Sequence, residues 1–218
     1  MSASLHFSEA DRRLIEEAVL RAESRTSGEI VPVVLARSGS YVSVTWKAAM
    51  VGLLPGLLLH EWLVISGAGW GGEPWIQQFL PMSILLGALL GIGLVRWVPA
   101  VARLLIPERE MIEMVHSRAQ QAFLENEVFQ TRERTGILLL VSLFERRVEV
   151  LGDTGITERV DDDAWGDVVA DIISGIKRGE SAKGMVAAID RCGQLLESAG
   201  VERRDDDTDE LDNTLRLG

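Results

Sequence analysis

The sequence has few of the residues from which most catalytic and metal sites are built. It contains one cysteine, Cys192, among 218 residues, so an internal disulfide is excluded and a reducing compartment is favoured. Its three histidines, His6, His60 and His116, form no H-x-x-x-H or H-E-x-x-H pair, which argues against a zinc site. No G-x-S-x-G motif and no Walker-type phosphate loop occurs. The common hydrolase and nucleotide-binding motifs therefore give no functional assignment.

Basic residues are scarce relative to acidic ones. Lys and Arg total 22 against 33 Asp and Glu, and the net charge of −11 argues against nonspecific nucleic-acid binding. Much of this charge lies in residues 202–212, where seven acids face only Arg203 and Arg204. Such a composition cannot bury a core, so residues 201–218 are predicted to be a disordered acidic tail. Residues 1–6 are neither basic nor apolar, so no cleaved signal peptide is expected.

Long apolar stretches are confined to the middle of the chain. Residues 48–59 carry no charge, and the apolar character resumes at 62–65. Residues 76–95 are also uncharged, and a membrane-spanning helix needs roughly 20 mostly apolar residues. The intervening segment 67–75 is rich in Gly and contains Pro, which disfavours a helix there. We therefore predict a two-helix transmembrane hairpin over residues 42–106.

Charges and aromatic residues near the hairpin predict its orientation. The loop between the two spans has a single charged residue, Glu73, whereas the outer flanks carry Arg37, Lys47, Arg96, Arg103 and Arg109. The positive-inside rule then places both termini in the cytoplasm, as in a two-span protein of the cytoplasmic membrane. Four tryptophans are expected at the lipid headgroups: Trp46, Trp62, Trp75 and Trp97. The alternative is a buried helical hairpin in a soluble protein.

Two features of the predicted spans bear on function. Gly87 and Gly91 form a G-x-x-x-G pattern, which suits close helix packing in lipid and predicts a homo-oligomer formed through the hairpin. His60 and Glu61 lie near the outer end of the first span. They form either a proton-responsive pair or an ordinary hydrated pair at the interface.

The flanks of the hairpin predict a small α/β domain. Helical periodicity follows Ser8, a predicted N-cap paired with Asp11, and it recurs over 107–129, from 161–163 to 179, and over 181–200. Apolar or alternating runs predict strands over 29–36, 136–144 and 147–151, with a turn over 152–156. Pro32 suggests that the first strand begins late or lies at an edge. We expect a mixed sheet sandwiched by helices, built from residues 7–41 and 107–200.

Three stretches of these flanks form a recognisable pattern. The first joins residues 7–11, in the opening helix, to Thr26-Ser27-Gly28-Glu29-Ile30-Val31 at the first strand. The second is the aliphatic hairpin from Gly136-Ile137-Leu138-Leu139-Leu140-Val141 to Arg146-Arg147-Val148-Glu149-Val150. The third is residues 179–184, just before the last helix. Together these stretches resemble the TPM domain family. The resemblance covers about residues 7–36 and 107–198, and the inserted hairpin resembles the bacterial predicted-membrane-protein branch of the family.

The resemblance implies a mixed sheet between helices, with an acidic patch that binds Ca²⁺ or supports acid-phosphatase activity in some members. This chain departs from the family pattern at two places. It has Arg134-Thr135 where the family often has Asp-Asn, and Gly152-Asp153-Thr154-Gly155-Ile156 where the family favours G-Y-G-L. Arg134 would place a positive charge beside any divalent ion at this patch.

The best candidate metal site combines a turn with an acidic helix start. Its residues are Asp153, Asp161, Asp162 and Asp163, with Glu149 as a further candidate. Ca²⁺ takes six to eight oxygen ligands, and such a turn could supply several. The alternative is that these acids cap a helix and interact with its dipole.

These observations leave three functional hypotheses. The first is a non-catalytic interaction or assembly module, held at the cytoplasmic membrane of a bacterium and binding lipid and an unidentified protein partner. The second is a membrane-tethered, divalent-cation-dependent acid phosphatase with Ca²⁺ as a candidate cofactor. The third is a hairpin that acts by oligomerisation.

Overall fold

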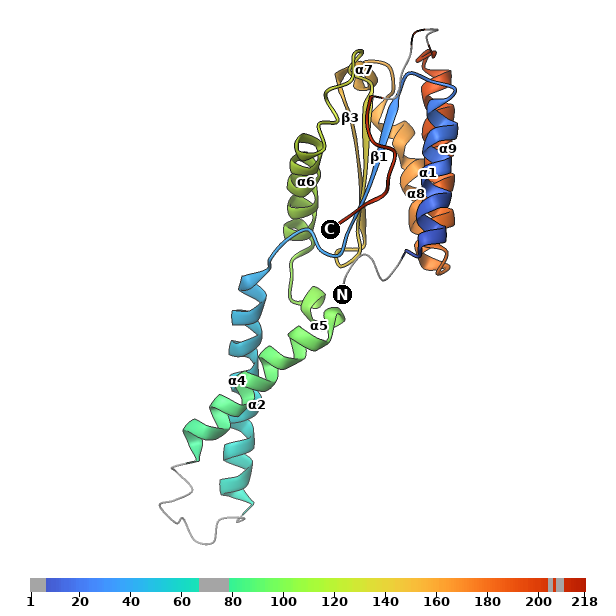
Figure 1. The fold of residues 1–218 in the computed structure, drawn as a ribbon. Coiled ribbons are helices and arrows are strands. Elements are labelled where there is room, and N and C mark those ends of the chain that lie inside the picture. Colours follow the sequence, from blue (N-terminus) through green and yellow to red (C-terminus); the bar gives the residue numbers. More distant parts are fainter. Residues whose placement is uncertain (1–6, 67–78, 204–205, 207–209) are drawn as a thin grey trace. The chain divides into compact units, whose positions relative to one another are not determined.

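The computed structural model describes residues 7–66, 79–203, 206 and 210–218 (Figure 1). The chain divides into two compact units, one made of residues 1–39 and 112–218 and the other of residues 40–111. The second unit is therefore an insertion in the first. Trp75 and the glycine-rich segment 67–75, which sequence analysis assigned to the loop between the spans, lie outside the described residues.

A four-stranded mixed sheet forms the centre of the first unit. Its strands are β1 (Glu29–Leu35), β2 (Gly136–Ser142), β3 (Arg147–Gly152) and β4 (Arg216–Leu217), in the order β3-β2-β1-β4. β1 and β2 are parallel and in register from Glu29 opposite Gly136 to Leu35 opposite Ser142, whereas β2 and β3 are antiparallel. Every residue of β1 and of β2 is buried. This pattern is typical of strands covered by helices on both faces.

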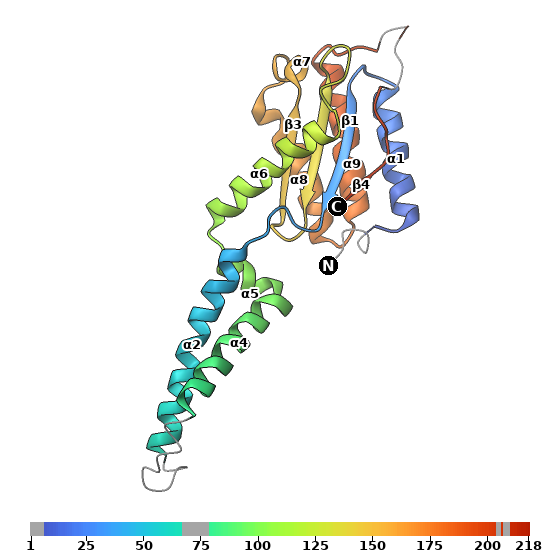
Figure 2. The same ribbon diagram turned by 60° about the vertical axis from the view of Figure 1, so that its left-hand side comes forward.

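The side chains of β1 and β2 alternate between two separate apolar clusters. Ile30 and Val34 point to one cluster, and Val31 and Val33 point to the other. The first cluster contains side chains of α1 (Glu9–Glu23), α8 (Trp165–Lys177) and α9 (Ser181–Ser198). The second contains Val115, Ala119 and Ala122 of α6 (Glu108–Glu125). Figures 1 and 2 show the sheet between α6 on one side and α1, α8 and α9 on the other, so the predicted fold class is confirmed.

Local signals set most of the helix boundaries. Ser8 caps α1 and forms a capping box with Asp11, and these hydrogen bonds lower the pKa of Asp11. Three local assignments differ from the prediction. The segment 152–156, predicted as a turn, overlaps a short helix, α7 (Thr154–Thr157). Asp162 and Asp163 lie in a 3₁₀ turn, Asp162–Ala164, that precedes α8, and Asp161 lies just before this turn. Ser181, which is expected to cap the last helix, is instead the first residue of α9.

Pro32 lies in the interior of β1, although a proline there suggested that the strand begins late or lies at an edge of the sheet. Alternate residues of a strand direct their backbone groups to opposite sides. Leu35 O accepts from Leu143 N on the β2 side, and Val34 O accepts from Gly218 N on the β4 side. Pro32 shares the β4 side with Val34. β4 pairs with β1 only at Val33 and Val34, so the missing N–H of Pro32 costs no bond to β2.

The prediction of a disordered tail is wrong for residues 210–218. This segment returns to the sheet as β4, and Leu215 is buried in the same cluster as α1 and α9. The net charge of the tail obscured this, because the acids precede a short alternating run, Leu215-Arg216-Leu217, that can lie on a sheet edge.

The second unit consists of two long apolar helices and a short one. They are α2 (Val42–Ile65), α4 (Leu80–Trp97) and α5 (Pro99–Leu104). α2 and α4 are long and apolar enough to span a membrane, and buried residues make up only 22% and 6% of their most apolar windows. Trp46, Trp62 and Trp97 are exposed. An apolar helix buried in a soluble core would show the opposite pattern.

Small residues form the contact between α2 and α4. A Cβ atom on Gly87 would lie 2.3 Å from the carbonyl oxygen of Gly52, and one on Gly91 would lie 2.2 Å from that of Ala48. Gly87 and Gly91 therefore lie directly against the backbone of α2 in the same chain.

The packing predicts that Gly87→Ala destabilises the hairpin. The added Cβ meets backbone rather than a movable side chain, and overpacking of this kind typically costs about 1–3 kcal/mol. Gly93→Ala is the matched control, because a Cβ there meets only the Trp97 side chain at 3.3 Å. The melting temperatures of the purified full-length variants in detergent measure the effect. An equal change for both variants would contradict the packing argument.

Burial predicts that the thiol of Cys192 is unreactive in the folded protein. Cys192 lies on α9 in the apolar cluster, and burial raises the pKa of its thiol to about 12. We expect no reaction with a thiol reagent at neutral pH until a denaturant unfolds the domain. Rapid labelling under native conditions would show that α9 opens. The same reaction reports unfolding of this unit in the experiments below.

Candidate functional site

Two polar clusters lie at opposite ends of the parallel β1–β2 pair. Arg134 and Asp153 lie at the end where both strands begin. Ser38, Ser142 and Glu145 lie at the end where both strands finish. Both clusters belong to the first unit.

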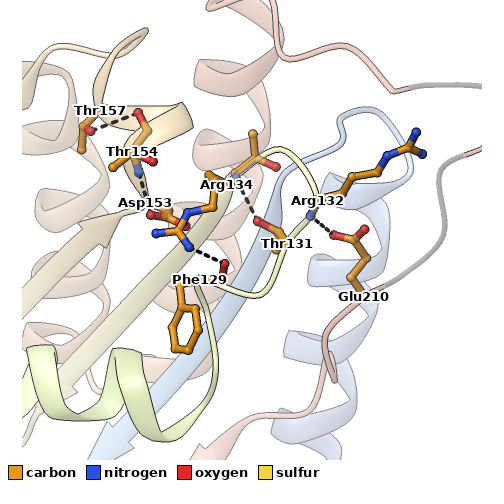
Figure 3. Close-up of polar contacts among 9 residues, drawn as sticks. Phe129, Thr131, Arg132, Arg134, Asp153, Thr154, Thr157 and Glu210 are labelled. Atoms are coloured by element: carbon orange, nitrogen blue, oxygen red, sulfur yellow. Dashed lines mark hydrogen bonds and ion pairs between the residues drawn. The ribbon is translucent and has the colours of Figure 1, made fainter.

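Asp153 is held where β3 ends and α7 begins. Its backbone N–H donates to Gly136 O at 2.9 Å, which ties it to the start of β2. Its Oδ1 accepts from Thr154 N at 2.7 Å and caps α7 (Figure 3). The side chain is only 4% exposed. A carboxylate this well buried needs a neighbouring positive charge or further hydrogen bonds.

Arg134 supplies the positive charge. Its Nε lies 2.9 Å from Asp153 Oδ2, and its Nη1 donates to Phe129 O at 3.0 Å (Figure 3). Among the described residues, Asp153 Oδ2 accepts no well-aligned hydrogen bond, so the contact with Arg134 is an ion pair. The backbone of Arg134 has φ of 59°, a conformation that favours Gly or Asn. The surrounding loop must therefore hold Arg134 in this conformation.

Backbone contacts hold the loop that carries Arg134. Arg134 N donates to Thr131 O at 3.1 Å, and Thr135 N donates to Thr131 Oγ1 at 2.9 Å. Gly155 N donates to Arg134 O at 2.9 Å, and a Cβ on Gly155 would lie 2.4 Å from Glu133 O. Gly155 thus permits the start of α7 to approach the loop, and this approach sets the distance between Arg134 and Asp153.

Among the side chains that the structure describes, the predicted metal ligands do not gather around Asp153. Asp161 and Asp163 are exposed, the side chain of Asp162 is not described, and Glu149 contacts His116 instead. Within the described residues, no group of three or more His, Cys, Asp or Glu side chains could hold a metal ion. Asp153 itself faces a guanidinium. This donor set does not suit Ca²⁺, which needs many oxygen ligands and no adjacent cation.

The cluster at the other end of the strands was not found from the sequence. Ser38 Oγ donates to Ser142 Oγ at 2.8 Å, and Ser142 Oγ donates to Glu145 Oε2 through a short hydrogen bond. Ser38 N also donates to Glu145 Oε1 at 3.1 Å. Ser142 and Glu145 are buried. A sequence signal existed, since polar residues follow two apolar runs directly, but the partnership required the strands to be parallel and in register.

The direction of these hydrogen bonds indicates a positioning role. Both hydroxyl protons are donated inward, toward the Glu145 carboxylate, and not toward solvent. The cluster joins the segment after β1 to the turn between β2 and β3. It therefore fixes the point at which the chain leaves the sheet before α2.

A third polar group lies on the surface between α6 and β3. His116 Nδ1 is 2.7 Å from Glu149 Oε1, and Gln120 Nε2 is 3.0 Å from His116 Nε2. A neutral imidazole with the proton on Nδ1 satisfies both contacts. His116 lies within the helical periodicity of residues 107–129, but nothing in the sequence indicates its pairing with Glu149.

The ion pair predicts a specific pattern of stability changes. Arg134→Ala leaves the buried Asp153 carboxylate without its counter-charge, and we expect a loss of about 1–3 kcal/mol because Arg134 is half exposed. Asp153→Asn in the same background should recover part of this loss, since Asn keeps the acceptor for Thr154 N. Arg132→Ala is the control, because its pair with Asp206 is exposed on both sides and should contribute less than about 1 kcal/mol. Denaturant unfolding followed by Cys192 labelling gives the values, and no recovery in the double variant would contradict the ion-pair assignment.

Comparisons with known proteins agree with this architecture. The family model described as TPM domain matches residues 99–195. The NMR structure of BA42 protein from the psychrophilic bacterium Bizionia argentinensis is similar with a TM-score of 0.58 and 20% sequence identity, covering 96% of this chain and 94% of that one. Identity at this level shows a shared fold alone. No curated protein matches the chain. The match spans β2, β3, α8 and most of α9, and it identifies this part of the chain as a TPM domain.

Proposed function

We propose that this chain is a membrane-anchored TPM domain that acts as a non-catalytic interaction or assembly module at the cytoplasmic face of a bacterial membrane. The observation that carries the proposal is the ion pair between Arg134 and Asp153. A guanidinium lies against the buried carboxylate at the point where the family resemblance would put a divalent cation.

A phosphatase of the implied type needs a cation to neutralise phosphate and to orient the attacking group. The guanidinium already neutralises Asp153, and bringing a dication beside it would place like charges together. Ser38 Oγ donates to Ser142 Oγ, and Ser142 Oγ donates to the Glu145 carboxylate. Neither cluster therefore offers an activated nucleophile beside a phosphate-binding group, and we assign structural roles to both.

The exposed apolar surface of α2 and α4 supports anchoring. Large apolar side chains cover the outward faces of both helices, and each would gain roughly 1.5–3 kcal/mol on leaving water. A helical hairpin that exposes so many large apolar side chains fits a lipid environment. Trp46, Trp62 and Trp97 lie near helix ends, where indole rings prefer the headgroup region. The basic residues outside the spans favour a cytoplasmic location for the TPM domain.

Membrane extraction and calcium titration test the two parts of the proposal separately. After alkaline carbonate treatment, we expect the full-length chain to remain in the membrane pellet, and recovery in the soluble fraction would refute anchoring. In detergent, calcium should leave the melting temperature unchanged, and hydrolysis of an aryl phosphate should not exceed that of Asp153→Asn. A saturable calcium shift together with calcium-dependent aryl-phosphate hydrolysis, both abolished by Asp153→Asn, would instead establish the cation-dependent phosphatase.

A further inference from the structure

The outer edge of β1 is covered by residues 210–218 of the same chain. Gly218 N donates to Val34 O at 3.1 Å, and Ala36 N donates to Gly218 O at 2.9 Å. Leu215 is buried in the apolar cluster of α1 and α9, and Leu217 packs against that cluster. This segment, hereafter the C-terminal strap, supplies backbone partners and apolar side chains together. Strand addition to a sheet edge uses the same two kinds of contact.

Charged groups hold the upstream end of the strap. The Glu29 carboxylate, at the start of β1, accepts from Glu210 N at 3.2 Å and from Leu211 N at 3.4 Å. Glu210 Oε2 in turn accepts from Arg132 N at 2.9 Å (Figure 3). Arg132 Nη1 also donates to Asp206 Oδ2 at 2.9 Å. The edge therefore recognises an extended segment with an acid before its apolar residues.

The strap fits this edge less completely than β2 fits the opposite one. β4 and β1 share two register pairs, whereas β1 and β2 share seven. Two buried polar atoms of the strap, Asn213 Oδ1 and Arg216 Nη1, have no hydrogen-bond partner among the described residues. An unsatisfied buried polar group costs about 1–3 kcal/mol. The strap is thus specific for its site but weakly held there.

We propose that the outer edge of β1 is a strand-binding site and that its partner is the C-terminal strap of a second copy of this chain. The site is closed in one copy by its own strap and is opened when two copies exchange straps. Every copy carries a sequence that already fits the edge, so a second copy is complementary by identity. This inference rests on the proposed function, because anchoring confines copies to one surface and raises their effective concentration.

After exchange, each β1 edge would make the same contacts with the strap of the other copy that it makes with its own strap. Each edge would again receive Leu215 and Leu217, and Glu29 would again accept the strap's N–H groups. The β1–β2 pairing is not involved, so the TPM domain keeps its core. Exchange therefore provides assembly without a new interface and without the glycine contact inside the hairpin.

Cysteine crosslinking between two full-length copies in native membranes tests the exchange. Val33 lies opposite Arg216 in the register, so Val33→Cys on one tagged copy and Arg216→Cys on a second, differently tagged copy can join only in trans. On oxidation we expect a crosslinked species carrying both tags. Val31→Cys is the matched control, because Val31 faces the same side of β1 as Val33 but has no partner residue in β4. Its crosslink to Arg216→Cys should be largely lost.

Two further measurements keep the proposal falsifiable. A single copy with both Val33→Cys and Arg216→Cys shows whether the strap reaches the edge at all. If this copy crosslinks internally while the mixed copies never do, exchange is refuted. A synthetic peptide of residues 210–218 should compete and lower the mixed crosslink, and lack of competition would also count against the site. Mixed crosslinking of a chain that carbonate extracts as soluble would support exchange and refute only the anchoring.

Discussion

The parallel pairing of β1 with β2 is the constraint on which the rest of the domain depends. It joins two segments that the hairpin separates in the chain, with seven residues in register and every one of them buried. Both faces of these strands are apolar, and helices cover both: α6 packs on one face, and α1, α8 and α9 pack on the other. Parallel strands need a long crossover, and the inserted helices α2 and α4 lie within it.

The same register determines where polar groups meet. At the beginning of the strands, Glu29 and the Arg134 loop lie near the end of β3, where Asp153 caps α7. At their finish, Ser38 meets Ser142 and Glu145. In one cluster an ion pair neutralises the buried Asp153 carboxylate, and in the other both serine hydroxyl groups donate inward. These pairings are the basis on which we propose an interaction module rather than a cation-dependent enzyme.

The two units differ in where their apolar side chains lie. In the TPM domain, apolar side chains are buried between sheet and helices, and the free edge of β1 is closed by the strap. In the hairpin, small residues bring the two helices together while the large side chains remain outside. The first arrangement suits water, and the second suits lipid. A sheet edge closed by a weakly paired strap is the part of the domain best suited to exchange.

Local patterns in the sequence determined the helices, the long strands and the apolar hairpin, since periodicity, capping residues and span length act within one element. Ser8 with Asp11, the run 136–142 and the uncharged stretch 76–95 are examples. Tertiary structure alone decided which residues become partners. The pairing of Arg134 with Asp153, the cluster at Ser38 and the return of 210–218 to β1 all join segments distant in the chain. Gly87 and Gly91 show the same limit: their spacing predicted close packing, but only the folded hairpin decided that the partner helix is α2 of the same chain.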